Sequence, residues 1–157
     1  DYPSLSEEEQ ILLSTTLESL PKLSQIIDGP TILRIQKAVR GIAVSHEVAN
    51  YAARLTRATR PGSPEAPDFV NQWVRWGCGP RAGQGLLLAA KSNAGLAGRS
   101  EATIEDVKKF VHPVMRHRMG LNFAAVSEGQ STDDIVDMLL EAVPVVASAP
   151  AAMAAAV

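Results

Sequence analysis

Apolar residues recur at intervals of three and four along most of the chain, which is the spacing of one face of an α-helix. Capping residues and helix breakers divide this pattern into six predicted helices. Their expected first residues are Ser6, Pro30, Ser45, Pro80, Thr103 and Ser131. Their expected apolar faces are Leu13, Leu17 and Leu20; Ile32, Ile35, Val39 and Ile42; Val48, Ala52, Leu55 and Thr59; Leu87, Ala90, Ala94 and Ala97; Val107, Phe110, Val111 and Val114; and Ile135, Leu139 and Val143. The pattern contains no βαβ unit.

Proline and glycine mark where these helices should end. The first helix opens with the capping-box pattern Ser6-Glu7-Glu8-Glu9 and should stop before Pro21. The third should close at Pro61, and the fourth at Gly98, because glycine tolerates the left-handed backbone of a helix C-terminus. Pro113 predicts a break or kink in the fifth helix.

Three stretches fall outside these helices. Residues 61–67, PGSPEAP, predict a loop, and residues 69–76 fit either a short helix or an extended segment. After Pro144 the chain reads VVASAPAAMAAAV, a low-complexity composition with little reason to pack uniquely. The expected fold class is therefore all-α: a helical bundle of about five to six helices with a flexible Ala-rich C-terminal tail.

Composition limits the class of protein. A chain of 157 residues with 46% hydrophobic content is long enough for one domain with a real core. Cys78 is the only cysteine, which excludes an intrachain disulfide and fits a reducing, cytoplasmic compartment. We find no signal peptide and no 18-residue apolar span, so no membrane partner is expected. Because the chain opens at Asp1 without methionine, we expect a fragment or a processed chain.

The net charge of −2 conceals a segregation of charge along the chain. Residues 1–53 carry four basic and seven acidic groups, residues 54–118 carry eleven and five, and residues 119–157 carry none and five. The middle segment is therefore basic, and both flanks are acidic. Such a segment can attract phosphates, although charged residues on solvated helix faces would give the same count.

Several apparent motifs fail on inspection. Residues 85–92, GLLLAAKS, nearly match a phosphate-binding loop, but Ala90 replaces the second glycine and the run continues a helix with no strand before it. His112 and His117 are five residues apart, which is not the spacing that places two metal ligands on one helix face. Cys78 has no histidine near it in sequence. We therefore expect no metal site and no catalytic residue in this chain.

The stretch GCGPRA, residues 77–82, places an arginine at the start of a helix. Pro80 suits the first helical position, and the glycines before it allow a sharp entry. Arg81 then projects beside free backbone N–H groups that attract anions. Because a guanidinium can grip a phosphate in two places, this geometry favours a phosphate sensor, although an arginine that simply reaches into solvent would fit the local sequence as well.

Four ordered segments together resemble the C-terminal lid of the MoxR family of AAA+ ATPases. The main one is FVNQWVRWGCGPRAGQGLLLAAKSNAGLAGRSEATIEDVKKFVHPVMRHRM, residues 69–119, with its Gly-Pro-Arg start, Ala-rich helix and Thr-x-Glu-Asp-Val helix. DYPSLSEEEQIL, residues 1–12, resembles the segment that leaves the family's ATPase core. ILRIQKAVRGIAVSHEVANYAARLTRATRP, residues 32–61, resembles its first lid helices, and NFAAVSEGQSTDDIVDMLLEAVP, residues 122–144, its usual C-terminus.

The resemblance implies a domain plan and a site. Residues 1–20 would leave the absent ATPase core and form the first helix, 21–143 would be the lid, and 144–157 the tail. Arg81 would be the sensor 2 residue, presented by Gly79 and Pro80, and would reach the γ-phosphate of ATP. The core would bind ATP and Mg²⁺, so this chain alone, without Walker A and Walker B motifs, should carry neither and should not hydrolyse ATP. Gly83 and Gly85 depart from the family pattern and predict a less rigid sensor helix.

The resemblance also implies partners. These are the AAA+ core of the same chain, neighbouring subunits of a hexameric ring, and proteins to be remodelled, often with von Willebrand A domains. Arg57 and Arg60 on the third helix, and Arg116 and Arg118 after the fifth, are candidates to face the core or a neighbouring subunit. The alternative is a stand-alone helical module that binds protein or nucleic acid. The acidic flanks and the lack of a recognition helix oppose nucleic-acid binding.

Overall fold

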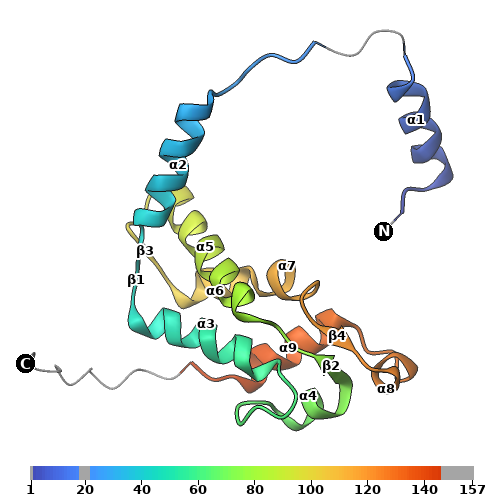
Figure 1. The fold of residues 1–157 in the computed structure, drawn as a ribbon, viewed down its shortest axis with the longest axis vertical. Helices are drawn as coiled ribbons and strands as arrows, with labels where there is room; N and C mark the ends of the chain where they lie inside the picture. Colours follow the sequence, from blue (N-terminus) through green and yellow to red (C-terminus); the bar gives the residue numbers. More distant parts are fainter. Residues whose placement is uncertain (1, 18–21, 146–157) are drawn as a thin grey trace, which may run out of the picture. The chain divides into compact units, whose positions relative to one another are not determined.

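The computed structural model describes residues 2–17 and 22–145 of the chain (Figure 1). The chain divides into two units, Asp1–Arg34 and Ile35–Val157. In chain order the described elements are α1 (Leu5–Thr15), α2 (Gly29–Gly41), β1 (Ala43–Val44), α3 (His46–Ala58), α4 (Asp68–Trp73), β2 (Val74–Trp76), α5 (Pro80–Leu96), β3 (Glu101–Ala102), α6 (Ile104–Lys109), α7 (Val111–Met115), β4 (Gly120–Leu121), α8 (Phe123–Ser127) and α9 (Thr132–Ala142).

The first unit contains α1 and the first turns of α2. The helix α1 starts two residues earlier than predicted, because Ser4 and not Ser6 forms the capping box. The Ser4 backbone N–H donates to the Glu7 carboxylate over 2.8 Å, and the Glu7 N–H donates back to the Ser4 hydroxyl. The helix also ends earlier, at Thr15. Of the leucines expected on its face, Leu13 and Leu17 are exposed, and Leu20 lies outside the described residues.

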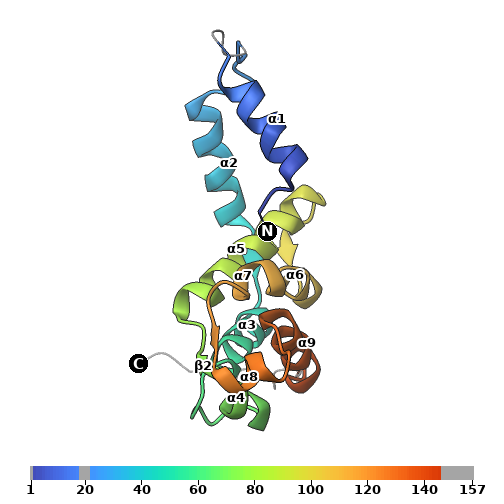
Figure 2. The same cartoon turned by 90° about the vertical axis from the view of Figure 1, so that its right-hand side faces the viewer.

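The second unit is a helical bundle organised around α5. This helix packs against α3, α6 and α7, and α9 packs against α3 and α7 (Figures 1 and 2). The core between them is apolar and fully enclosed. Its largest buried side chains include Leu55, Leu86, Met115, Ile135 and Leu139. Burial of such side chains, at about 1.5–3 kcal/mol each, is the main driving force for this arrangement.

Serine and threonine caps start three of the bundle helices where the sequence predicted them. Ser45 caps α3, Thr103 caps α6 and Ser131 caps α9, each through a side-chain oxygen that accepts a backbone N–H from the first turn. Gly98 follows the C-terminal end of α5, as predicted. Its φ of 71° is the left-handed conformation expected of a glycine that terminates a helix.

Two pairs of short strands tie the loops of the bundle together. Strand β1 pairs with β3 in parallel, with Ala43 opposite Glu101, and β2 pairs with β4 in antiparallel fashion, with Val74 opposite Leu121. The short helices α4 and α8 lie together at the same end of the bundle as β2 (Figure 2). The sequence left an extended segment open at β2 but did not predict the other strands, because two residues are too few to show an alternating pattern.

The predicted all-α class is confirmed, but several details differ. The described residues form nine helices instead of five or six, since α4 and α8 are additional and the predicted fifth helix is two. That helix breaks at Phe110, not at Pro113, which sits in the first turn of α7 where a missing N–H costs nothing. Residues 69–76 are helix and then strand. In α5, Ala90 and Ala94 are buried as predicted, whereas Ala97 is exposed and Ala82 and Leu86 are buried in addition.

Residues 146–157, on which the expectation of a flexible tail falls, lie outside the described part of the chain. Across the described residues, we find no helix that is both long enough and apolar enough to span a lipid bilayer.

Candidate functional site

The start of α5 presents Arg81 at the surface of the bundle. Gly79 is the N-cap residue in an extended conformation, and Pro80 is the first helical residue, as predicted. Arg81 is exposed, whereas Cys78 before it and Ala82 after it are buried. Within residues 2–17 and 22–145, the Arg81 guanidinium forms no hydrogen bond and no ion pair. The side chain thus projects from a segment that is anchored by the buried residues Cys78 and Ala82, and it is itself available to a ligand.

The loop before α5 is fastened to the C-terminal end of α3. The Cys78 backbone N–H donates to the Thr59 hydroxyl over 2.8 Å, and the Cys78 carbonyl accepts from Arg60 Nε over 2.8 Å. The Thr59 hydroxyl in turn donates to the Thr56 carbonyl over 2.7 Å. Gly77 lies so close to α3 that an added Cβ would stand 2.2 Å from the Thr59 carbonyl oxygen. Glycine is therefore required there by close backbone approach.

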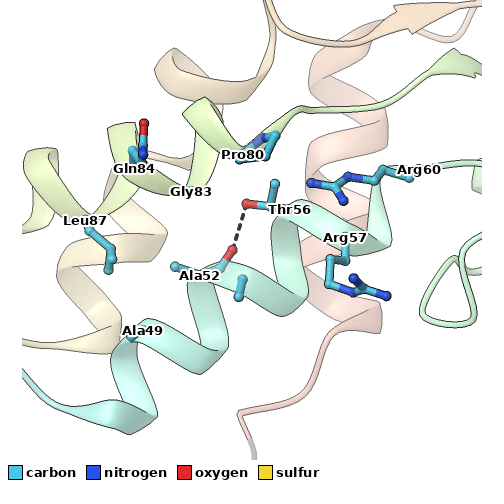
Figure 3. A pocket seen from close by; sticks show the side chains of 10 residues that line it. Ala49, Ala52, Thr56, Arg57, Arg60, Pro80, Gly83, Gln84 and Leu87 are labelled. Carbon is cyan, nitrogen blue, oxygen red and sulfur yellow. Dashed lines mark hydrogen bonds between the residues drawn. The ribbon is translucent and has the colours of Figure 1, made fainter.

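A groove of about 290 Å³ runs between α3 and the first half of α5 (Figure 3). Arg60 and Pro80 lie at one end of it, near the origin of Arg81, and Ala49 and Leu87 lie at the other. Its lining residues are Ala49, Ala52, Ala53, Thr56, Arg57, Arg60, Pro80, Gly83, Gln84 and Leu87. The groove is therefore apolar along most of its length and cationic at the end beside the start of α5.

Gly83 and Gly85, which predicted a less rigid sensor helix, have a packing role. A Cβ at Gly83 would meet the Thr56 hydroxyl at 3.3 Å, and one at Gly85 would meet Val114 Cγ1 at 3.2 Å. The two glycines let α5 approach α3 on one side and α7 on the other. Their low helix propensity, about 1 kcal/mol each relative to alanine, is offset by this closer packing.

The other arginines predicted as interface candidates fall into two groups. Arg60 donates a hydrogen bond to the Cys78 carbonyl in the loop before Arg81. Arg57, one turn earlier, forms a two-point ion pair with Glu65 at 2.8 and 3.1 Å. The Arg57 hydrogen bonds lower the pKa of Glu65 to about 2.

Arg116 and Arg118 follow α7. Arg116 forms an ion pair with Asp133 at 3.0 Å. Arg118 donates to the Val114 carbonyl and touches the ring of His117. Of the eleven basic side chains in residues 54–118, four are thus paired with carboxylates: Arg57, Arg99, Lys108 and Arg116. The basic middle segment is therefore partly neutralised within the fold, which leaves less charge for a polyanion.

Cys78 is buried, and His112 lies beside a carboxylate. Burial raises the pKa of the Cys78 thiol, and this outweighs the opposite effect of the nearby Arg118 and Arg60 charges. Such a thiol stays protonated near neutral pH. His112 Nε2 lies 2.9 Å from the carboxylate of Asp137. In the described part of the chain, no three His, Cys, Asp or Glu side chains come together as metal ligands.

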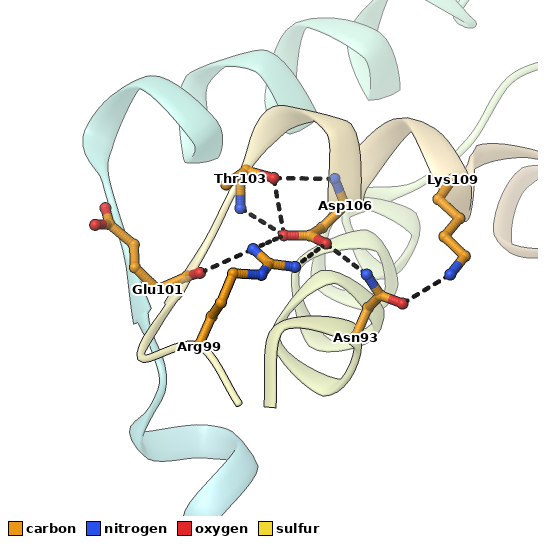
Figure 4. Close-up of polar contacts among 6 residues, drawn as sticks. All are labelled: Asn93, Arg99, Glu101, Thr103, Asp106 and Lys109. Atoms are coloured by element: carbon orange, nitrogen blue, oxygen red, sulfur yellow. Dashed lines mark hydrogen bonds and ion pairs between the residues drawn. The ribbon is translucent and has the colours of Figure 1, made fainter. Parts of the chain in front are cut away.

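The opposite end of α5 holds a buried carboxylate that the sequence only partly revealed (Figure 4). The Asp106 carboxylate accepts two hydrogen bonds from Arg99, at 2.6 and 2.8 Å, one from Asn93 and one from the Thr103 backbone N–H. Lys109 donates a hydrogen bond to the side-chain oxygen of Asn93. The Arg99 guanidinium, more than any other group, holds the pKa of Asp106 far below its ordinary range despite burial.

The capping pattern Thr103-x-x-Asp106 was the only sequence signal for this cluster. Thr103 is the N-cap residue of α6, and Asp106 completes the capping box. Arg99 and Asn93 lie on the far side of a turn, so nothing in the local sequence connects them to Asp106. Likewise, the Thr59 and Cys78 contact joins residues 19 apart, and no local pattern predicts it.

The chain is similar in sequence to one protein family and to two known proteins. Residues 69–139 match the AAA lid domain family. The chain is 31% identical, over 90% of its length, to Chaperone MoxR1 of Mycobacterium tuberculosis, of which it covers 37%. It is 26% identical, over 92% of its length, to the uncharacterized protein YeaC of Bacillus subtilis, of which it covers 42%.

A solved structure shares the fold. It is a protein from Cytophaga hutchinsonii proposed to be an ATPase, with a TM-score of 0.74 and 23% sequence identity, over 94% of this chain and 45% of that one. The chain therefore spans less than half the length of each of these three relatives.

Proposed function

We propose that this chain, which belongs to the MoxR family of AAA+ ATPases as a C-terminal lid domain, couples ATP binding and hydrolysis in a longer protein to the remodelling of partner proteins. In this proposal Arg81 is the sensor 2 residue, presented by Gly79 and Pro80. It contacts the terminal phosphate of ATP that is bound by the nucleotide-binding core outside this chain.

The observation that carries the proposal is the setting of Arg81. A cation in the first turn of a helix faces the positive end of the helix dipole, so Arg81 does not help to stabilise α5. No carboxylate in the described residues compensates it. Yet Cys78 before it and Ala82 after it are buried, and the loop that leads to it is fastened to α3. The fold therefore fixes a cation that it does not use internally.

Such an arginine suits a phosphate ligand. Its planar fork can donate two charge-assisted hydrogen bonds to phosphate oxygens, and the free N–H groups at the start of α5 favour the same negative charge. ATP offers a terminal phosphate that ADP lacks, so a contact made with it gives the two nucleotide states different energies. Such a difference is the condition for a ligand to move a domain.

Nucleotide chemistry itself is assigned to the core. In this proposal the Mg²⁺ and triphosphate ligands belong to the nucleotide-binding core of the longer protein. The contribution of this chain is to position one guanidinium and to carry the nucleotide signal into the bundle through α5.

The partners follow from the same proposal. The lid would contact the core of its own chain and neighbouring subunits of a hexameric ring in the cytoplasm. Arg57, Arg60, Arg116 and Arg118 stay candidates for these contacts, with Arg57 and Arg116 already ion-paired within the lid. The remodelled proteins would include ones with von Willebrand A domains.

The test is ATP turnover of the full-length protein with Arg81→Ala. We expect a decrease approaching about 10³-fold, the lower end of the range for arginines that stabilise a transferred phosphoryl group. Arg81→Lys should recover only part of the rate, because an ammonium cannot form the two-point contact.

Arg75→Ala is the matched control, since Arg75 is another exposed arginine of the same segment; its guanidinium lies 5.5 Å from the centre of the Trp76 ring and has no ion pair among the described residues. It should turn over ATP like the wild type. Wild-type turnover in Arg81→Ala, with the bundle folded by circular dichroism, would refute the proposed role.

A further inference from the structure

We infer that Arg60 and Thr59, at the C-terminal end of α3, are positioning residues that fix where Arg81 is presented. The inference rests on the role proposed above for Arg81. According to this inference, the end of α3 contributes to the response to nucleotide, together with the Gly-Pro-Arg stretch.

Both polar backbone groups of Cys78 are engaged by these two consecutive residues. Thr59 accepts the Cys78 N–H, and Arg60 Nε donates to the Cys78 carbonyl, each over 2.8 Å. Thr59 is fully buried, and its hydroxyl also donates to the Thr56 carbonyl, so it cannot rotate away without losing two hydrogen bonds. A buried backbone group without its partner costs about 1–3 kcal/mol, so this attachment is strongly favoured.

Little freedom remains between this attachment and Arg81. Only Gly79 and Pro80 separate Cys78 from Arg81, and the proline ring fixes one backbone angle. On the other side, Ala82 is fully buried, and Gly83 lies against the Thr56 hydroxyl. The backbone of Arg81 is thus held by α3 both before and after it, and a shift of the end of α3 must move it.

Arg60, just after α3, differs in this respect from the two arginines within that helix. Arg54, Arg57 and Arg60 recur every three residues, but Arg54 donates to the Pro144 carbonyl and Arg57 pairs with Glu65. Within the part of the chain that the structure describes, Arg60 is the member of this series that reaches the loop before α5. Figure 3 shows its side chain extending toward Pro80 at the end of the groove.

The test measures, in the full-length protein, the ratio of the dissociation constants for ADP and for a slowly hydrolysed ATP analogue. A positioning defect should lower the preference for the ATP analogue, because the contact to the terminal phosphate weakens while the rest of the nucleotide binds as before. A general loosening of the fold would weaken both nucleotides together and leave the ratio unchanged. Thr59→Val removes the hydroxyl at nearly constant shape, and Thr59→Ser is its matched control because it keeps the hydroxyl.

We expect Arg60→Ala and Thr59→Val each to lower the preference for the ATP analogue by about tenfold, within the usual range of coupling between sites. Thr59→Ser should keep the wild-type ratio, and Arg60→Lys, which retains one donor, should fall in between. In an Arg81→Ala background, Arg60→Ala and Thr59→Val should change the ratio no further. This non-additivity is the signature of residues that act through Arg81.

Other outcomes are distinguishable. Wild-type ratios in both Arg60→Ala and Thr59→Val would overturn the inference, as would an equal loss with and without Arg81, which would mean that Arg60 acts on the nucleotide by itself. If Arg60→Ala does not fold, the Thr59 pair decides the question alone. A wild-type ratio in Arg81→Ala would instead contradict the proposed function.

Discussion

Helix α5 has an arginine near each end, and the fold treats the two in opposite ways. At the C-terminal end, Arg99 is bound at both terminal amino groups to Asp106, whose carboxylate is only 4% exposed. At the N-terminal end, Arg81 has no carboxylate in the described residues, although Cys78 before it and Ala82 after it are buried. Arg99 is near the negative end of the helix dipole, where a cation is favoured, and Arg81 is at the positive end.

The difference separates stability from function. Every interaction of Arg99 stabilises the bundle, so its presence is explained by the fold. Arg81 forms no ion pair or hydrogen bond with the described residues, so it does not contribute to the stability of the bundle in this way. A cation that is held in place but not neutralised points to a partner outside the chain. The following predictions test this contrast, beginning with the largest expected effect.

Asp106→Ala should be the most damaging substitution. It removes the partner of Arg99, the acceptor for Asn93 and the Asp106 half of the capping box of α6, and the loss of hydrogen bonds to a charged group costs about 1.5–3 kcal/mol. Chemical denaturation followed by circular dichroism measures the loss of free energy of unfolding. Glu105→Ala is the control, because Glu105 is exposed and, among residues 2–17 and 22–145, forms an ion pair with Lys108 alone; a loss as large in the control would contradict the account.

Gly77→Ala should destabilise the N-terminal end of α5, where Gly79→Ala should have a much smaller effect. An added Cβ at Gly77 would stand 2.2 Å from the Thr59 carbonyl oxygen, whereas one at Gly79 meets nothing within 4 Å. Overpacking of this kind costs about 1–3 kcal/mol. Comparing the two thermal midpoints tests whether the loop is pressed against α3. Equal midpoints would show that it is not.

The contribution of Asp106 should depend on pH. Its pKa is lowered in the folded protein, so the ionised carboxylate stabilises the fold above the unfolded pKa of about 3.9. That stability is lost as the pH falls below this value toward the folded pKa. The difference in unfolding free energy between the wild type and Asp106→Asn should therefore be complete at pH 7 and shrink below about pH 4. A difference that does not change between these pH values would contradict the assignment.

Arg81→Ala should have the smallest effect on stability. The thermal midpoint should stay within the error of the measurement, because the side chain is exposed and makes no contact that the fold depends on. Arg99→Ala, its counterpart at the other end of α5, should lower the midpoint clearly. If the two variants melted alike, the contrast between the two ends would be lost.

The sequence predicted where helices begin better than it predicted the long-range contacts between them. Ser45, Thr103 and Ser131 start helices as predicted, and Pro80 opens α5, because capping chemistry acts within one turn. The break at Phe110 was missed, since proline is harmless in a first turn and Pro113 therefore marked the wrong position. The Arg99 and Asp106 pair and the Thr59 and Cys78 contact depend on which helices pack together, and that is decided by the whole core.

For the candidate site, the sequence identified Arg81 and its cap but not the residues that hold them. Arg60 could be singled out only as one of three evenly spaced arginines. Its hydrogen bond to Cys78 arises because Gly77 brings the loop against the end of α3. Similarly, Gly83 and Gly85 looked like weak points of the helix until their neighbours Thr56 and Val114 were known.

The central claim, that Arg81 reads the terminal phosphate of ATP, is tested most directly by two crystal structures of the full-length protein, one with a slowly hydrolysed ATP analogue and Mg²⁺ and one with ADP. The account predicts that an Arg81 terminal nitrogen lies about 2.7–3.2 Å from a γ-phosphate oxygen in the first structure, and that in the second Arg81 contacts no phosphate. An Arg81 side chain that points into solvent in both structures would contradict it.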